Sequence, residues 1–332
     1  MLFLILTVLT VTEIKGAKLE LLIFRYFKML KEKKQLPKNI AWNGISLKIP
    51  LTWEIDSLDA THMLIGEDGL PRTEIKWTDA PKKFTLEKYL KRFISQSQKI
   101  LNIKIHELPT PGSFSHPVKN FEFFFFSWES ASSTGNGTLI FCSHCKRLTI
   151  FRFFSDSQIL LNSLPTLILT SFTDHPMNDQ SHWQLFGLNF AIPRSFGLLE
   201  YSFKPGCYVI HFKNKKTSLT FFSWGPASFL LSKTSLSEFA TERLPQMKGF
   251  AKAGVCIRGN YLEWSYRHGR FKNADVLPFL NRYSLFTICR VCHDKQNNRI
   301  FGIMVDSTKK YEHDLIKWSI IGEPKKKQSD KK

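Results

Sequence analysis

The feature that most constrains the fold of this chain is an internal repeat. The segment Gly44–Pro50 starts with a glycine, largely alternates apolar and polar residues and ends in Ile-Pro, and Gly187–Pro193 does the same 143 residues later. Two C-x-x-C pairs follow at a similar separation, since Cys142 and Cys289 are 147 residues apart. A chain of 332 residues is long enough for two domains that each bury a core. The sequence therefore predicts a tandem duplication.

The elements between these markers occur in the same order in both copies. A helix is predicted over Thr85–Ile94 in the first copy and over Ser235–Leu244 in the second, where Ser235 and Glu238 have capping-box spacing. Short β-branched and aromatic runs predict strands, for example Thr73–Trp77, Tyr208–Phe212 and Leu219–Trp224. This order predicts the α+β class: two similar sandwich domains, each an antiparallel sheet with helices and a C-x-x-C β-hairpin.

Changes in composition give the predicted domain boundaries. They are an apolar and basic N-terminal segment over 1–40, a first repeat over 41–174, a polar linker over 175–182, a second repeat over 183–322 and a disordered lysine-rich tail over 323–332.

The N-terminal residues 1–28 leave three interpretations open. The apolar run Met1–Thr12 looks like the core of a signal peptide, but no basic residue precedes it, and it is shorter than the roughly 20 residues that span a bilayer. Met29 also offers a start that leads directly into the first domain. The segment is then an unused upstream start, a weak export or anchor segment, or an amphipathic helix. We expect a cytoplasmic protein, or an exported or anchored one if the segment is a real signal.

The chain is strongly basic, with a formal net charge of +19. Part of the excess lies in 1–40 and 323–332, and the rest is spread over both predicted domains. Such a charge favours anionic partners, nucleic acid or acidic proteins, but lysines and arginines on solvated faces give the same composition. The protein partner itself cannot be named from the sequence.

Four of the six cysteines form the two C-x-x-C pairs, which is typical of metal binding in intracellular proteins. A C-x-x-C at the tip of a hairpin supplies half of a tetrahedral thiolate site. Equivalent hairpins of a duplicated fold can meet across a pseudo-two-fold axis. We therefore predict one structural zinc site shared between the repeats, with these ligands: Cys142, Cys145, Cys289 and Cys292.

Other interpretations of these cysteines stay open. The neighbouring His144 and His293 can replace a ligand or flank the site, and an iron–sulfur cluster takes the same number of thiolates. Separate redox-active dithiols and incidental pairs are further alternatives. Cys207 and Cys256 lie outside the pattern and are expected to be small buried apolar residues.

Catalytic signatures are not found in the sequence. It contains no G-x-S-x-G elbow, no phosphate-binding loop of the G-x-x-x-x-G-K type and no G-x-G-x-x-G turn. A closed four-thiolate site also leaves no coordination position for a catalytic water. An enzyme with a site in the cleft between the repeats is therefore the least favoured function.

Aromatic residues beside basic ones occur in Lys146–Phe154 and Tyr266–Lys272. They can stack on and neutralise single-stranded nucleic acid, but alternating strand faces give the same pattern with the aromatics in the core, and we prefer the core. The tryptophans in or beside predicted strands are assigned to packing: Trp42, Trp53, Trp77, Trp128, Trp183, Trp224 and Trp264.

The repeat resembles the PsbP-type fold, named for an extrinsic subunit of photosystem II. Its members commonly begin Gly-hydrophobic-Ser-x-x-Ile-Pro followed by a tryptophan, as in Gly44–Pro50 with Trp53, whereas the second copy has Phe196 in place of the tryptophan. The resemblance covers about 41–321 and implies a binding or assembly module without catalysis. The C-x-x-C pairs are not part of that pattern, so no functional residue is carried over. We expect a non-catalytic interaction or scaffold protein, with a basic nucleic-acid-binding protein as the alternative.

Overall fold

A computed structural model describes residues 38–111, 114–117, 120–154, 163–175, 179–244, 252–256, 259–268 and 285–308, and at 252–256, 259–260, 266–268 and 285 only the backbone is considered. Most of the predicted N-terminal segment, the lysine-rich tail and the basic aromatic run Tyr266–Lys272 lie outside the described side chains.

Antiparallel strands dominate both halves of the chain. The first half contains β1 (Lys38–Trp42), β2 (Ile45–Ile49), β3 (Glu54–Asp59), β4 (His62–Glu67), β5 (Leu70–Asp79), α3 (Leu86–Leu101), β6 (Lys104–Leu108), β7 (Phe121–Glu129), β8 (Thr134–Cys142), β9 (Arg147–Phe154) and α4 (Ser163–Ser171). The second half contains β10 (Gln180–Leu185), β11 (Leu188–Pro193), β12 (Gly197–Lys204), β13 (Cys207–Lys213), β14 (Thr217–Trp224), α5 (Ala227–Leu230), α6 (Leu236–Arg243), β15 (Lys252–Cys256), β16 (Gly259–His268), β17 (Leu285–Asp294) and β18 (Arg299–Ser307). The first strand of each half begins slightly before the predicted repeat boundary.

The two halves repeat the same sheet topology. One seven-stranded sheet has the order β3-β4-β5-β9-β8-β7-β6, and the other has the order β12-β13-β14-β18-β17-β16-β15. The two orders correspond strand by strand: β12 takes the place of β3, β18 that of β9 and β15 that of β6. The path of the chain is therefore duplicated, although the architecture is richer in sheet than the predicted α+β sandwich.

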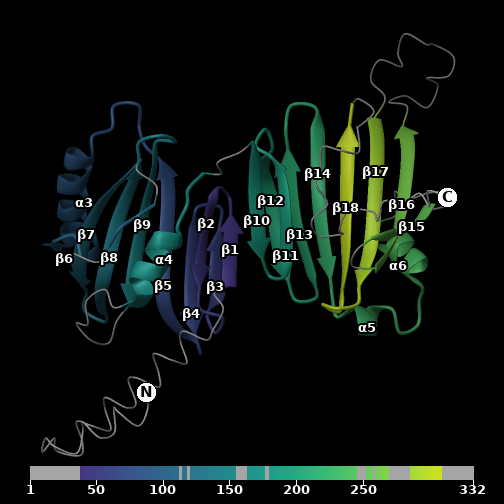
Figure 1. Ribbon diagram of the computed structural model, residues 1–332, viewed down its shortest axis with the longest axis horizontal. Coiled ribbons are helices and arrows are strands. Elements are labelled where there is room, and N and C mark those ends of the chain that lie inside the picture. The colour runs from purple at the N-terminus through teal and green to yellow at the C-terminus, as the bar shows by residue number, and fades with distance from the viewer. Residues whose placement is uncertain are drawn as a thin grey trace, which may run out of the picture.

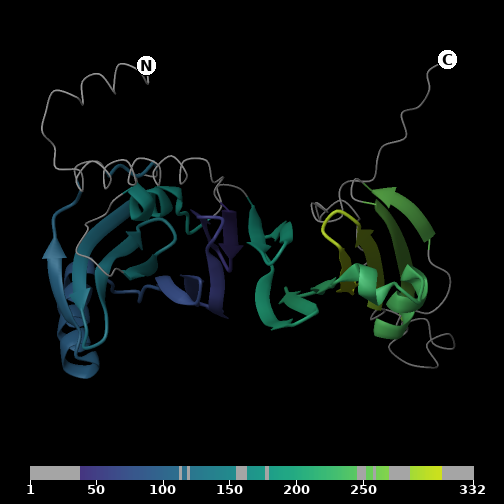
Figure 2. The same ribbon diagram turned by 90° about the horizontal axis from the view of Figure 1, so that it is seen from below.

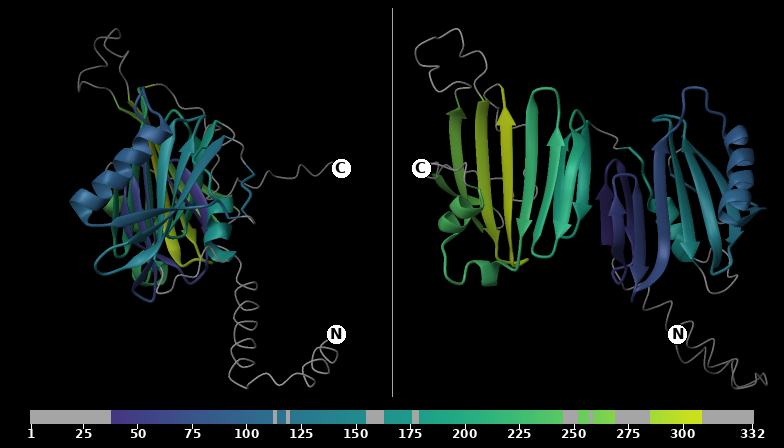
Figure 3. Two further views of the ribbon diagram at one scale, coloured as in Figure 1. Left: turned by 90° about the vertical axis from the view of Figure 1, so that its left-hand side faces the viewer. Right: turned by 180° about the vertical axis from the view of Figure 1, so that it is seen from behind.

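A third sheet, which the sequence did not predict, joins the halves. Its order is β11-β10-β1-β2, so the first hairpins of the two halves pair edge to edge (Figures 1 and 3). In this pairing Ala41 lies opposite Gln184, and these two residues are separated by the same 143 positions as the repeat. Equivalent residues thus face each other, which places a pseudo-two-fold axis between β1 and β10.

The glycine that opens each repeat belongs to the tight turn of these hairpins. Asn43 and Gly44 connect β1 to β2, Phe186 and Gly187 connect β10 to β11, and all four have positive φ. Positive φ at both central residues is the type I′ turn, whose twist matches that of the flanking strands. The motif Gly-apolar-polar therefore marks a hairpin turn followed by a half-buried strand.

Replacing these two glycines by alanine is expected to have unequal effects. A Cβ at Gly187 meets no atom within 4 Å, whereas a Cβ at Gly44 would lie 2.5 Å from Nη1 of Arg147. Gly187→Ala should cost about 1–2 kcal/mol of unfolding free energy for the left-handed backbone alone. Gly44→Ala should cost about 0.5–1.5 kcal/mol more, because the end of the Arg147 side chain must shift and loses its hydrogen bond to the Asp174 carbonyl. Paired denaturant titrations measure this difference, and equal costs would contradict the described contact.

Helices flank the seven-stranded sheets: α3, α5 and α6 cover faces that point away from the central sheet, whereas α4 packs on the inner face beside β2. Aromatic residues fill the cores. Figure 2 shows α3 and α4 on opposite sides of the first sheet, with α5 and α6 together beside the second. The helix after Ser235 is confirmed with its capping box, whereas Thr85 stands at the N-cap of α3 without a side-chain capping bond. The assignment of seven tryptophans to packing is confirmed, since all of them are buried: Trp42, Trp53, Trp77, Trp128, Trp183, Trp224 and Trp264.

Candidate metal centre

The first C-x-x-C lies at the tip of a hairpin, as predicted. Cys142 is the last residue of β8, Cys145 lies in the four-residue turn, and Lys146 turns the chain back with a φ of 59°. The amide of Lys146 donates to the carbonyl of Cys142 at 2.9 Å, which closes the turn. The amide and hydroxyl of Ser143 both donate to the carbonyl of Asn120, at 2.9 and 3.1 Å. These bonds fix both sulfur atoms on one side of the turn.

A second segment, just after α4, reaches the same place. Thr173 forms a β-bridge with Ser46 of β2, with backbone hydrogen bonds of 2.8 Å in both directions and a hydroxyl contact of 2.6 Å. The guanidinium of Arg147 donates from Nη1 to the carbonyl of Asp174 at 2.9 Å. With the backbone held on both sides, the side chains of Asp174 and His175 face the cysteine turn.

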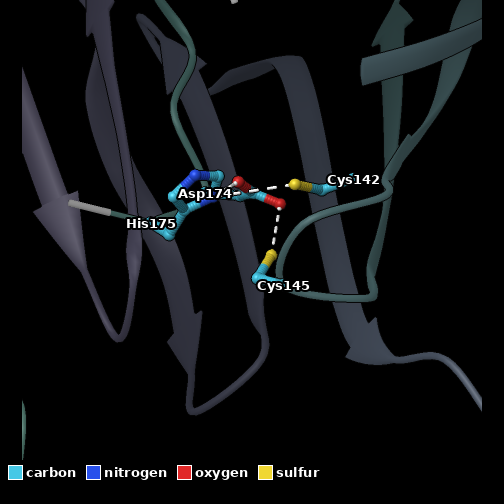
Figure 4. A group of neighbouring side chains, drawn as sticks. All are labelled: Cys142, Cys145, Asp174 and His175. Atoms are coloured by element: carbon cyan, nitrogen blue, oxygen red, sulfur yellow. Dashed lines mark hydrogen bonds and ion pairs between the residues drawn. The ribbon is translucent and has the colours of Figure 1, made fainter. Parts of the chain in front are cut away.

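These four side chains form one compact group (Figure 4). Their nearest donor atoms all lie within 4.8 Å of one another. Sγ of Cys145 lies 3.0 Å from Oδ2 of Asp174, Nδ1 of His175 lies 2.5 Å from Oδ1 of Asp174, and Sγ of Cys142 lies 3.7 Å from Nδ1 of His175. The carboxylate is thus hydrogen-bonded to a thiol on one side and to the imidazole on the other.

The environment of the group favours a neutral thiol unless a cation is present. Burial raises the pKa of the Cys145 thiol, and the Asp174 carboxylate, which accepts its hydrogen bond and repels the thiolate, raises this pKa further. Asp174 itself is only 2% exposed. A divalent cation would favour the thiolate instead, because a thiol releases its proton when it binds a metal ion.

The donor set is one that can hold a metal ion. Zinc takes sulfur at about 2.3 Å in a tetrahedral shell, which places two thiolates about 3.8 Å apart. With nitrogen and oxygen ligands at about 2.0–2.1 Å, the same shell places a sulfur about 3.5 Å from a nitrogen or oxygen ligand, and the nitrogen about 3.4 Å from the oxygen. The S–N, S–O and N–O contacts of 3.7, 3.0 and 2.5 Å differ from these values by less than about 1 Å, and side-chain rotation covers such a change. Two sulfurs with one nitrogen and one oxygen suit zinc better than an iron–sulfur cluster, which typically takes four thiolates.

The second C-x-x-C does not contribute to this group, which corrects the predicted shared site. Cys289 and Cys292 lie inside β17 rather than in a turn. Residues three apart in a strand point to opposite faces of the sheet. Cys289 therefore packs in the cluster under α5 and α6, and Cys292 packs in the central core, which also contains residues of the four-stranded sheet. Among the described residues, the group that can hold a metal includes neither of them. The four predicted thiolates therefore do not converge.

The register of the hairpins explains the difference. In the second half the turn after β17 runs from Asp294 to Arg299, and Asn298 has the positive φ that Lys146 has in the first half. The structural counterpart of Cys142 is therefore Asp294, and that of Cys145 is Asn297. The amide nitrogens of Asn297 donate to the Asp294 carboxylate at 3.2 and 2.8 Å. A polar turn thus replaces the thiol pair in the second half.

Sequence reasoning missed two of the four donors. Asp174 was assigned as the last residue of the first repeat and His175 as the first residue of the linker. Of the two predicted auxiliary histidines, His144 is exposed, but its ring lies 4.8 Å from that of His175. His293 lies in β17, paired with Ile300. Cys207 is half-buried, and the side chain of Cys256 lies outside the described residues.

The basic aromatic run after the turn packs as the core prediction expects. Phe151 and Phe153 of β9 are buried in the central core, and Arg152 instead donates to Glu74 on the opposite face. The rings of Phe151 and Phe153 therefore cannot stack on bases unless the sheet unfolds. Nucleic-acid binding remains a prediction that rests on charge alone.

Comparison with known proteins gives no family. No protein-family model matches the chain, and no curated protein does. Among solved structures, the immunity protein TplEi of T6SS from Pseudomonas aeruginosa complexed with "L" peptide aligns at TM-score 0.31 and 10% identity, over 83% of this chain and 88% of that chain. Its apo structure aligns at TM-score 0.26 and 10% identity, over 83% and 89%.

Likeness at this level carries no argument about fold or function. The resemblance of 41–321 to the PsbP-type fold therefore stays a prediction. Within the part of the chain that the structure describes, none of the helices has the length and apolar character needed to cross a membrane.

Proposed function

We propose that this chain is a non-catalytic interaction protein, a two-repeat scaffold whose first repeat carries a structural zinc ion. The observation that supports it is the convergence of Cys142, Cys145, Asp174 and His175 from two segments that are separate in the sequence. Four protein donors fill a tetrahedral shell and leave no position for a reacting water, which is typical of structural rather than catalytic zinc.

The place of the group in the fold suggests what the ion does. The cysteine turn belongs to the first seven-stranded sheet, whereas Asp174 and His175 begin the connection from α4 to β10. Zinc held by both would pin the start of this connection to the hairpin of the first repeat. The ion would thereby fix the segment that leads into the second repeat, which suits a rigid scaffold for a protein partner.

Cobalt(II) substitution tests the donor set. Cobalt in a tetrahedral site with thiolate ligands gives intense visible bands and a thiolate charge-transfer band whose strength increases with the number of sulfur ligands. We expect a tetrahedral spectrum with the intensity of two thiolates. A spectrum with four thiolates would restore the site shared with Cys289 and Cys292, and a weak octahedral spectrum would refute the proposed centre.

A further inference from the structure

The residue that the donor set leaves unexplained is Arg147. It is the first residue of β9, two positions after Cys145, and its side chain is only 21% exposed. Its Nε is buried without a hydrogen-bond acceptor, and its ion pair with Oδ1 of the exposed Asp79 is long, at 3.8 Å. A guanidinium that is buried this far at the edge of a metal-capable group needs a reason.

One hydrogen bond and its place in the chain connect Arg147 to the donors. Its Nη1 donates to the carbonyl of Asp174 at 2.9 Å and so holds the backbone that carries both Asp174 and His175. Arg147 itself begins β9 directly after the cysteine turn. It therefore links the segment of the cysteines to the segment of the other two donors.

The charge of a loaded centre gives a second argument. Two thiolates and one carboxylate carry three negative charges, and a divalent ion with a neutral imidazole neutralises two of them. One negative charge remains in a largely buried place. The fixed positive charge of Arg147 lies beside it and offsets it, because opposite charges at short range stabilise each other most where water is excluded.

Resting on the proposed zinc function, we propose that Arg147 is the positioning residue of the centre: it orients Asp174 and His175 and balances the charge of the loaded site. Partners outside the ligand shell that orient ligands typically change metal affinity by about 10–100-fold when they are removed.

The duplication supplies a matched control in Arg299. It is the first residue of β18, as Arg147 is of β9, but it follows the polar turn of the second half. Its Nε donates to the hydroxyl of Ser223 at 2.7 Å, and its guanidinium lies 4.6 Å from the ring centre of Tyr208. Replacing it removes an arginine from the same place in the fold without affecting a metal donor.

The test is a zinc titration of the full chain in competition with a chromophoric chelator. We expect Arg147→Gln to weaken zinc binding about 10–100-fold, Arg147→Lys to recover part of that loss through its charge, and Arg299→Gln to leave the affinity unchanged. The melting temperature without zinc provides the second readout. If Arg147 were merely structural, replacing it would lower this melting temperature and leave the zinc affinity unchanged.

Each outcome separates the two proposals. If the wild-type chain binds zinc and Arg147→Gln binds it equally well, or Arg299→Gln weakens it to the same extent, the role of Arg147 is refuted and the centre stands. If the wild-type chain itself does not bind zinc, both proposals fall.

Discussion

Replacing Trp42 with alanine is expected to lower the free energy of unfolding by about 3–5 kcal/mol. The indole is fully buried, and its ring centre lies 5.1 Å from that of Trp183 and 5.0 Å from that of Tyr201. Its Nε1 also donates to the carbonyl of Asp59 at 2.8 Å. The substitution therefore opens a cavity where the two halves meet and leaves a polar group without its partner.

The consequence should reach beyond the first half. Hydrogen exchange of the β10 amides is expected to accelerate in Trp42→Ala, because β10 pairs with β1 and packs on this indole. Trp128→Ala is the control, since Trp128 is equally buried but belongs to the cluster under α3. That variant should lose similar stability without exposing β10. Unchanged exchange in Trp42→Ala would show that the central sheet does not couple the halves.

Saturation with zinc is expected to raise the free energy of unfolding by about 4 kcal/mol when free zinc exceeds its dissociation constant a thousandfold. The reason is linkage: the folded chain gathers the four donors, and the unfolded chain separates the cysteine turn from Asp174 and His175. Denaturant titration in buffered zinc and in excess chelator measures the difference. Cys145→Ser should remove most of it, and a wild-type chain that unfolds identically in both buffers would contradict the account.

Local sequence signals predicted what depends on local chemistry. The turn glycines Gly44 and Gly187, the capping box at Ser235 and the first cysteine turn all lie where their patterns place them. In each case a few neighbouring residues determine the backbone, through positive φ or a capping hydrogen bond. The repeat could be recognised for the same reason, since its markers are short and local.

The second C-x-x-C misled because spacing alone does not define a turn. Between Cys289 and Cys292 stand Arg290 and Val291, which suit a strand, whereas the polar run Lys295–Asn298 contains the residues that turn the chain. Alternation along β17 places the two sulfurs on opposite faces, so this strand cannot offer them to one ion. The polar run after the second pair therefore predicts the turn better than the cysteine spacing does.

Contacts between distant segments could not be predicted in this way. His175 approaches Cys142 where Thr173 pairs with Ser46, a contact across more than a hundred residues. The pairing of β1 with β10 likewise joins strands that are far apart in the chain. Such pairings depend on the shape of the assembled sheets rather than on a local pattern.

The central claim is that one zinc ion binds the first repeat alone. The most direct test is the metal content of the purified full chain by elemental analysis, for wild type, Cys142→Ser and Cys289→Ser. The account predicts one zinc per chain in wild type and in Cys289→Ser, and none in Cys142→Ser, because only Cys142 belongs to the donor group. Loss of zinc from both variants, or its absence from wild type, would contradict it.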